Sequence, residues 1–233
     1  MNVDVKSPYE QINNLFGGEF IKGDITQFFG QSGTGVTSIP IKTAIEVAAN
    51  GGTAAIVLTD FVSYKIESIA QKHDKPTEDI LRNIFIHTAI DFEKQSNLVF
   101  DELEAIFKLV DCFVFDSFTE NYQTERSQLS PHDNPTSSPM GKEKKLEKEL
   151  QNQCIEILSQ ARRYDVATIL TTDVYIDSET KTMTPIGSNR VSDWCNTIIK
   201  CEKDDSWVQD SKERVVTVVD GVNNVDCSQK ITM

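Results

Sequence analysis

The sequence predicts an α/β fold, in which a mostly parallel, twisted β-sheet is flanked by helices and extended by antiparallel strands near the C-terminal end. Two observations predict it. Short apolar runs alternate along the chain with segments of helical periodicity, and the last part of the chain changes to strand-like runs separated only by turn residues. The composition is that of a globular protein, because 39% of the 233 residues are hydrophobic and 25% are charged.

Five apolar runs are the predicted parallel strands. They are short, rich in β-branched and aromatic residues, and lack strict alternation with polar residues, which is typical of strands buried on both faces. Helical segments between them favour right-handed crossovers and therefore parallel pairing. The runs span residues 25–29, 54–58, 84–86, 112–115 and 166–170.

The segments between these strands carry apolar residues three and four positions apart. Such spacing places one apolar stripe of a helix against a sheet. Four stripes meet this description: Ala44, Ile45, Ala48 and Ala49; Val62, Ile66, Ile69 and Ala70; Val99, Leu103, Ile106 and Phe107; and Leu146, Leu150, Cys154, Ile157 and Ala161.

Two further segments complete the plan of the chain. Residues 197–201, 214–219 and 227–231 are strand-like runs, and we predict that they form the antiparallel extension. Residues 123–142 are rich in Ser, Pro and Thr and contain almost nothing apolar, so we predict a mobile loop there. We expect residues 1–233 to form a single domain.

Composition and charge exclude several classes of protein. The 23 basic and 36 acidic residues give a net charge of −13, so DNA or RNA binding needs a locally basic patch. No run approaches the roughly 20 apolar residues of a membrane span, and the start resembles no signal peptide, so we expect no membrane partner. The five cysteines are an odd number without C-x-x-C spacing, which favours free thiols and a cytoplasmic protein.

A glycine-rich turn follows the first predicted strand and precedes a helix. It fits the phosphate-binding pattern G-x-x-x-x-G-K-[ST] except at the lysine, where the chain has valine. Glycines let backbone N–H groups curl around phosphates, and the helix N-terminus adds a positive dipole end. The alternative is a tight strand-to-helix turn that binds nothing. The candidate nucleotide-binding residues are Gly30, Gln31, Ser32, Gly33, Thr34, Gly35, Val36 and Thr37.

A second element points to the same chemistry. The apolar strand at residues 112–115 ends in Asp116, as in the strand that holds Mg²⁺ in P-loop proteins. Any strand end can carry an aspartate, but its position after the glycine-rich turn within one α/β domain makes the match more specific. Thr37 and Asp116 are therefore the candidate Mg²⁺ ligands of a bound nucleotide.

A longer set of motifs begins with the run at residues 15–27 and includes the acidic strand at residues 112–119. This set resembles the core of the RecA/RadA recombinase family, and most closely its archaeal RadB members. The run LFGGEFIKGDITQ at residues 15–27 is similar to the segment that leads into the phosphate-binding loop of those proteins, and residues 112–119 resemble their acidic strand. Further matches lie, in the family's order, at residues 160–164, 171–175, 185–188 and 194–195.

The resemblance covers essentially the whole chain and implies a RecA-like P-loop NTPase core that binds ATP or ADP with Mg²⁺. It also implies a role in DNA repair and homologous recombination, with a recombinase of the RadA type as partner. We expect no N-terminal helix-hairpin-helix domain like that of RadA. None of the twelve phenylalanines begins the F-x-x-A motif with which RadA forms filaments.

The chain departs from the family at four functional positions. Val36 replaces the phosphate lysine, and Asp173 stands where the family has the glutamine that senses the γ-phosphate. Asp60 is a weak candidate for the glutamate that positions the attacking water, because the turn at residues 61–63 is shortened. Residues 220–224 lack the basic cluster of RadB proteins. These departures predict weakened nucleotide binding and impaired or absent hydrolysis, as in a pseudo-ATPase.

The resemblance places DNA contacts in two loop regions, and their charge predicts weak binding to single- or double-stranded DNA. Basic and acidic residues balance over residues 123–149, and acidic residues exceed basic ones over residues 174–193. The three histidines show no catalytic or metal-ligand spacing, so we expect them to be structural or surface residues. The candidate DNA contacts are Lys142, Lys144, Lys145 and Arg190.

Three functions remain open from the sequence. The first is a RadB-like accessory protein that acts through a recombinase partner with little hydrolysis. The second is a weak DNA-dependent P-loop ATPase, in which Lys22, Lys42 or a lysine of a neighbouring subunit supplies the missing charge. The third is a nucleotide-free interaction module of the wider RecA superfamily. Nucleotide binding separates the third function from the others, and turnover separates the second from the first.

Overall fold

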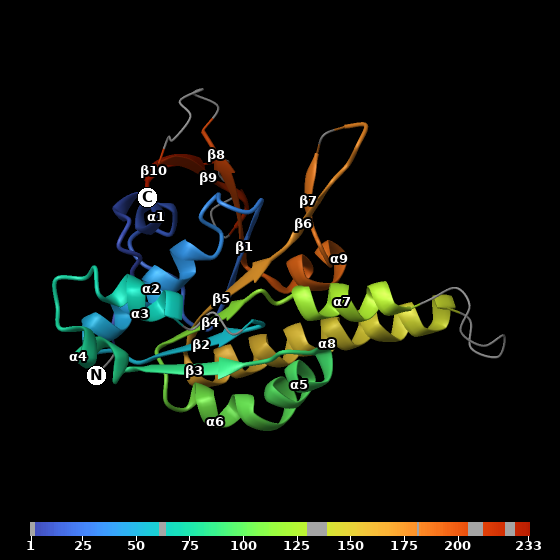
Figure 1. Ribbon diagram of the computed structural model, residues 1–233, viewed down its shortest axis with the longest axis horizontal. Helices are drawn as coiled ribbons and strands as arrows, with labels where there is room; N and C mark the ends of the chain where they lie inside the picture. Colours follow the sequence, from blue (N-terminus) through green and yellow to red (C-terminus); the bar gives the residue numbers. More distant parts are fainter. Residues whose placement is uncertain (1–2, 61–63, 130–138, 181, 205–211, 222–226) are drawn as a thin grey trace.

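The computed structural model describes residues 3–60, 64–129, 139–180, 182–204, 212–221 and 227–233. Its central feature is an eight-stranded sheet of order β10-β9-β8-β1-β5-β4-β2-β3 (Figure 1). The strands are β1 (Ile25–Gly30), β2 (Ala54–Leu58), β3 (Ile84–Thr88), β4 (Cys112–Asp116), β5 (Ala167–Thr172), β8 (Thr197–Lys203), β9 (Glu213–Asp220) and β10 (Cys227–Thr232). A separate antiparallel pair is formed by β6 (Val174–Ile176) and β7 (Met183–Pro185).

Most of the sheet is parallel, as predicted. β1 lies between β5 and β8 and runs parallel to both, and β4, β2 and β3 continue the parallel order. The antiparallel part begins with β9, which pairs antiparallel with β8 on one side and with β10 on the other. The predicted C-terminal extension is therefore confirmed, and its first strand also continues the parallel sheet.

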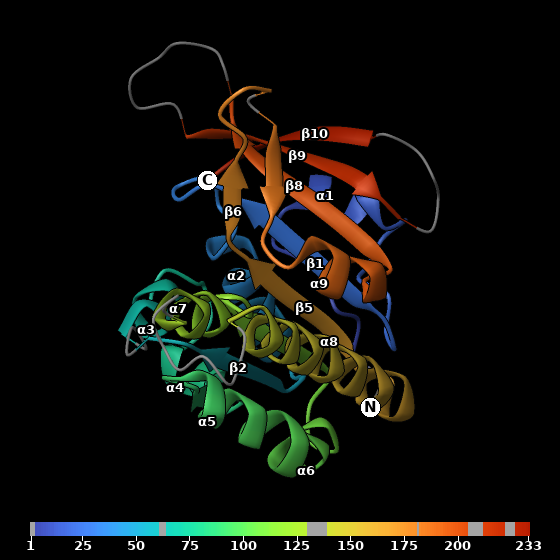
Figure 2. The same cartoon turned by 90° about the vertical axis from the view of Figure 1, so that its right-hand side faces the viewer.

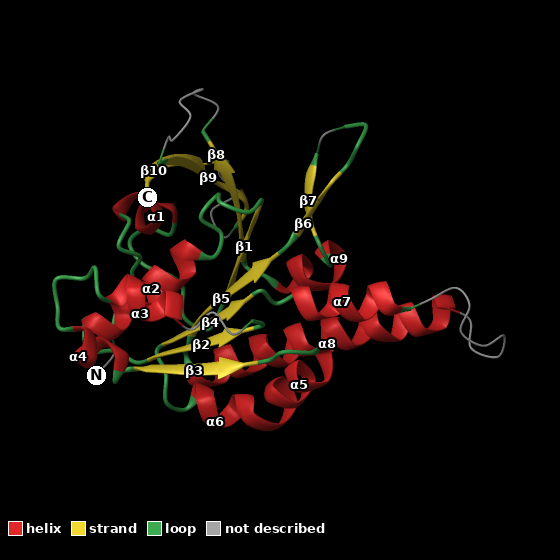
Figure 3. Ribbon diagram, viewed as in Figure 1, coloured by secondary structure: helices red, strands yellow, loops and turns green. Residues whose placement is uncertain are grey.

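Helices cover both faces of the sheet (Figures 1 and 3). On one face lie α1 (Glu10–Leu15), α2 (Ser38–Ala49), α3 (Tyr64–Ala70) and α4 (Thr77–Leu81). On the other lie α5 (Phe92–Asn97), the π-helix η1 (Leu98–Glu102), α6 (Leu103–Phe107), α7 (Glu120–Gln128), α8 (Pro139–Tyr164), α9 (Ser188–Val191) and the 3₁₀-helix η2 (Ser192–Trp194) (Figure 2). None of the described helices has the length and apolar character to cross a membrane.

The two faces have separate hydrophobic cores, because β-strand side chains alternate between them. On the α2 face, Phe28, Ile56 and Val114 are fully buried. On the α8 face, a row of aromatic rings runs from Phe107 through Phe113 and Phe115 to Phe118, with ring centroids 4.8, 6.3 and 5.3 Å apart. This row leads from the helical layer to the end of β4, where the candidate aspartate lies.

Two sequence predictions need correction. β3 was expected to be buried on both faces, but it is an edge strand, and the side chains of Phe85 and Ile86 are each 42% exposed. The loop expected over residues 123–142 is shorter, because α7 continues to Gln128 and α8 begins at Pro139. Residues 130–138 lie outside the described part of the chain, as do the shortened turn at 61–63, Val62 of the second predicted stripe, and His132.

Candidate functional site

The glycine-rich loop connects β1 to α2, where the parallel strands end. Gly30 is the last residue of β1 and packs against β8 so closely that a Cβ atom would lie 2.3 Å from the carbonyl oxygen of Cys201. Gly35 has a φ of +99°, in the left-handed region that favours glycine. The hydroxyl of Thr34 donates to the carbonyl of Gln31 at 2.7 Å, and α2 begins at Ser38. Close packing and backbone conformation therefore both require glycine here.

Val36 stands at the lysine position of this loop. Its side chain is partly buried and packs against the hydrophobic core on the α2 face. An aliphatic side chain offers no donor to a phosphate, so this position contributes packing in place of charge. Any binding of an anion by the loop would then depend on its backbone N–H groups and on cations from elsewhere.

Asp116, the last residue of β4, lies beside the start of α2. The hydroxyl of Thr37 donates to Oδ1 of Asp116 at 3.1 Å, and the hydroxyl of Thr171 donates to the same oxygen. Burial raises the pKa of Asp116 above its usual value, and the two hydroxyl donors partly offset that effect. The nearby carboxylates of Asp60 and Asp173 raise the pKa of Asp116 further. The geometry thus joins both candidate Mg²⁺ ligands.

A cavity of about 180 Å³ lies at the ends of β2, β4 and β5. Parallel strands place their carboxyl ends at the same edge, and Leu58 of β2 is in register with Asp116 of β4. The cavity is lined by Thr37, Ile41, Leu58, Thr59, Asp60, Asp116, Ser117, Glu120 and Asp173. The structure therefore brings together four predicted site residues that are far apart in sequence.

Asp173 is held in this cavity by hydrogen bonds from three sides. Its Oδ2 accepts from Ser117 Oγ at 3.1 Å and from Gln123 Nε2 at 2.8 Å. Its backbone N–H donates to the Thr119 hydroxyl at 3.1 Å. A carboxylate fixed in this way presents negative charge at the position where the resemblance predicts a neutral glutamine. The side chain of Thr59 also donates to Glu120, which adds a fourth acidic group to the cavity wall.

The donor set suits a magnesium–nucleotide complex better than a metal ion alone. Mg²⁺ is usually held by one or two protein oxygens together with substrate phosphates and water. Thr37 and Asp116 supply such oxygens. Among the described residues, no group of three or more His, Cys, Asp or Glu side chains is arranged to hold a metal ion. Without a divalent cation, the acidic wall would repel a phosphate chain.

The lysines suggested as substitutes for the missing one lie elsewhere. Lys42 donates to the hydroxyl of Tyr9 at 2.5 Å and lies over the Tyr9 ring. Lys22 acts electrostatically on Cys112, the first residue of β4, and so lies toward the opposite end of that strand from Asp116. Neither lysine contributes to the cavity wall.

The candidate DNA contacts do not form one cluster. Lys142 and Lys145 line a cavity of about 460 Å³ between α5, α7 and α8, and Lys144 is exposed on α8. Arg190 lies in a different cavity, of about 310 Å³, with Tyr122, Arg126 and Tyr175. That second cavity lies at the base of the β6–β7 pair, which projects away from the sheet (Figure 1).

Acidic residues of α8 already neutralise the two arginines of this cavity. Arg126 forms an ion pair with Glu143 at 2.6 Å, and Arg190 approaches Glu147 at 3.4 Å. Arg126 was expected in a loop with balanced charge, whereas the structure places it on α7 facing α8. This cavity therefore combines aromatic and cationic side chains. A phosphate group of DNA would have to compete with Glu143 and Glu147 for the two arginines.

Several site residues were missed from the sequence. Thr171 lies near the end of β5, two residues before Asp173, and Thr59 directly follows β2. Their positions at strand ends could have identified them. Lys203 of β8 and Arg214 of β9 lie against Gly33 of the loop, with the Arg214 Nε donating to the Gly33 carbonyl at 2.9 Å. No sequence motif marks these two residues, because their contact depends on the pairing of β8 with β1.

Comparisons with known proteins agree with this geometry. The family model described as Rad51 matches residues 2–228. The DNA repair and recombination protein RadB of Methanobrevibacter smithii is 30% identical over 213 residues, which cover 89% of this chain and 83% of that protein. RadB of Halobacterium salinarum is 26% identical over 195 residues, covering 82% and 78%.

A solved structure shows the same fold. The crystal structure of the RadB recombinase aligns with a TM-score of 0.73 at 19% identity, covering 96% of this chain and 93% of that chain. The predicted RecA-like α/β core is thereby confirmed. The resemblance noted from residues 15–27 and 112–119 is confirmed as well. The chain belongs to the Rad51 family, as a RadB-like member of the RecA/RadA recombinases.

Proposed function

We propose that this protein has a RadB-like role in DNA repair and homologous recombination, as a nucleotide-binding accessory protein with little or no ATP hydrolysis. Family membership supports the role, since the matching relatives are named as DNA repair and recombination proteins. The single observation that carries the nucleotide part is the contact of Thr37 with Asp116 at the mouth of the glycine-rich loop. The two residues at the expected Mg²⁺-ligand positions, Thr37 and Asp116, therefore lie in hydrogen-bond contact.

The same cavity supports weak hydrolysis. Catalysis of phosphoryl transfer depends on positioning and on stabilising the charge that develops on the phosphoryl oxygens. Val36 supplies no charge, and Asp60, Asp173 and Glu120 line the cavity in which the outer phosphate would lie. Acidic groups there oppose the developing negative charge. Bound nucleotide would therefore act as a structural ligand.

The partner is proposed to be a recombinase of the RadA type, docked on the edge of the sheet at β3. This edge has unpaired backbone groups, and three apolar side chains near it, Phe85, Ile86 and Ile90, are each at least 40% exposed. Such an edge favours addition of a strand from another protein. DNA contact is proposed to be secondary and to use the cavity of Tyr122, Arg126, Tyr175 and Arg190.

The nucleotide proposal is tested by Val36→Lys, with Val36→Met as the uncharged control of similar length. A lysine adds one charge-assisted contact worth about 1.5–3 kcal/mol. We therefore expect the lysine variant to bind Mg-ATP and Mg-ADP about 10- to 100-fold more tightly than the parent protein in calorimetric titration. Failure of the parent and of both variants to bind either nucleotide would show that the loop is not a phosphate site. Turnover of the parent at ordinary ATPase rates, abolished by Asp116→Ala, would refute the pseudo-ATPase part.

A further inference from the structure

Positive charge next to the glycine-rich loop comes from the C-terminal part of the sheet. The interior wall of the nucleotide cavity is acidic, and the loop itself carries no charged side chain. A phosphate chain seated on the loop therefore needs cations from outside the sequence motif. Two cationic side chains, Lys203 and Arg214, lie against Gly33 at the tip of the loop.

Lys203 is the last residue of β8 and is exposed to solvent. A Cβ atom on Gly33 would lie 3.6 Å from Lys203 Cε and 3.7 Å from Lys203 Nζ, so the ammonium group rests on the loop where glycine leaves room. In the part of the chain that the structure describes, no carboxylate forms an ion pair with Lys203. Its ammonium group lies beside the loop, where it could contact a ligand of the loop.

The pairing of β8 with β1 fixes the position of Lys203 relative to the loop. β8 runs parallel to β1 with Cys201 in register with Gly30, so the end of β8 and the start of the loop leave the sheet side by side. The contact between Gly30 and the Cys201 carbonyl holds this arrangement without a gap. Lys203 lies two residues beyond Cys201, and its side chain reaches Gly33 at the loop tip.

Arg214 fixes the loop tip from the neighbouring strand β9. Its Nε donates to the Gly33 carbonyl at 2.9 Å, and Nη1 donates to the backbone carbonyl of Glu213 at 2.8 Å. Lys203 is in register with Arg214 across the two strands. Arg214 is thus a positioning residue that holds Gly33, while Lys203 places its ammonium group beside Gly33.

We propose that Lys203 supplies, from β8, the positive charge for the phosphate chain of a bound nucleoside di- or triphosphate that the loop lost at Val36. This inference rests on the proposed nucleotide binding and names its further binding residue. An ammonium on a flexible stem can follow the phosphates of either nucleotide as a point charge. AMP, with one phosphate, gains least from it.

The test is a cycle of four proteins: the parent, Lys203→Ala, Val36→Lys and the double variant. Each is titrated calorimetrically with Mg-ATP, Mg-ADP, AMP and pyrophosphate. In the parent background we expect Lys203→Ala to weaken Mg-ATP and pyrophosphate binding about five- to tenfold. With lysine at position 36, we expect the same substitution to cost less than about twofold, because the charge is then supplied twice.

Two controls separate a charge effect from a change in folding. Lys108→Ala removes the same charge from an exposed side chain at the C-terminal end of α6, which belongs to the helical layer on the other face of the sheet. There Lys108 forms an ion pair with Glu104 of the same helix. This substitution should leave binding unchanged. Lys203→Ala should also lower the dependence of Mg-ATP affinity on salt concentration, which loss of packing alone would not do.

The outcomes distinguish this inference from the proposed function. If Val36→Lys binds nucleotide and Lys203→Ala binds as the parent does, the inference is wrong and the nucleotide site stands. If the parent binds nothing but Val36→Lys does, the inference is again wrong, since Lys203 then does not replace the missing charge. If neither binds any of the four ligands, the proposed nucleotide function fails and the inference with it.

Discussion

Asp116 shows how single residues of this site were predictable in position while their energetics were not. Three other site residues also come after parallel strands: Thr37, Asp60 and Asp173. Because parallel strands end at one edge of the sheet, the sequence could predict that these residues lie close together. What it could not supply was the raised pKa of Asp116. That shift depends on burial and on carboxylates contributed by the ends of β2 and β5.

The raised pKa predicts how stability depends on pH. A carboxyl group whose pKa is higher in the folded than in the unfolded protein binds its proton more tightly when folded. Its contribution to stability therefore falls as the pH rises from the unfolded-state pKa through the folded-state pKa. Asp116→Asn removes the charge and keeps an oxygen to accept from Thr37 and Thr171. We expect a higher Tm at pH 7 and a flatter pH profile between the ordinary carboxyl pKa and neutrality, measured by thermal denaturation.

Asp177→Asn is the matched control for this prediction. Hydrogen bonds from the backbone and side chain of Thr180, with another from the backbone of Glu179, lower the pKa of Asp177. The stability that Asp177 contributes is therefore present above the unfolded pKa and lost as the pH falls. Its substitution should leave neutral-pH stability equal or lower. A fall in Tm for Asp116→Asn at pH 7 would contradict the buried-charge explanation.

Among the elements, α7 was the helix hardest to predict. Its sequence ENYQTERSQ is polar throughout, and Asn121 and Tyr122 are its buried residues, so no apolar stripe marks it. Hydrogen bonds anchor it instead. Asn121 Nδ2 donates to the Ala89 carbonyl at 2.6 Å and to Gln95 Oε1 at 3.1 Å. Apolar periodicity identified α2 and α8, but it cannot find a helix that is held by buried amides.

This polar network extends to α8 through Gln153, which is fully buried. Gln153 Oε1 accepts from Gln95 Nε2 at 2.8 Å, and its Nε2 donates to Ser96 Oγ at 2.8 Å. Gln153→Ala leaves Gln95 and Ser96 buried without these hydrogen bonds. We expect a loss of at least about 1–3 kcal/mol in the free energy of unfolding, measured in urea.

Asn152→Ala provides the control on the same helix. Its side chain is exposed, and surface substitutions usually stay within about 0.5 kcal/mol. Equal stability of the two alanine variants would mean that the network contributes packing only. The network also includes the Phe118 carbonyl, which accepts from Gln95 at 3.0 Å two residues after Asp116, so its loss should weaken nucleotide binding as well.

For the whole molecule, net charge and its distribution decide the partners. The protein has a net charge of −13, and Arg126 and Arg190 are paired with Glu143 and Glu147. It should therefore bind DNA at the nonspecific end, with a Kd of about 10⁻⁴ to 10⁻⁶ M at physiological salt. Glu147→Gln removes the acidic partner of Arg190. We expect it to strengthen single-stranded DNA binding severalfold in titrations at about 50 and 200 mM salt, where phosphate contacts lose most affinity.

Glu78→Gln, on the exposed helix α4, makes the same charge change away from this cavity and should have little effect. A pull-down with the recombinase of the same cell belongs beside these titrations, since we expect that contact to be the stronger one. Nanomolar DNA binding at the higher salt, together with no recombinase retained, would refute a protein that works mainly through its partner.

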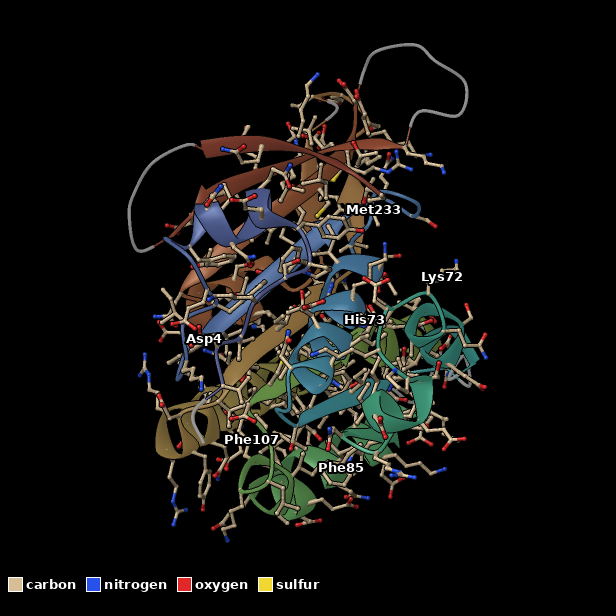
Figure 4. All side chains as sticks on the ribbon, turned by 90° about the vertical axis from the view of Figure 1, so that its left-hand side faces the viewer. Asp4, Lys72, His73, Phe85, Phe107 and Met233 are labelled. Carbon is tan, nitrogen blue, oxygen red and sulfur yellow. The ribbon has the colours of Figure 1, made fainter. Side chains whose placement is uncertain are left out.

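The C-terminal end of β10 offers one practical consequence. Met233 packs over the glycine-rich loop, where a Cβ atom on Gly35 would lie 2.5 Å from its sulfur and 3.2 Å from its methyl carbon (Figure 4). The chain contains four methionines. A protein labelled with ¹³C at the methionine methyl groups therefore gives a simple NMR spectrum, in which the Met233 signal comes from a methyl group in contact with the loop. Resonance shifts of that signal report directly whether a ligand has reached the loop.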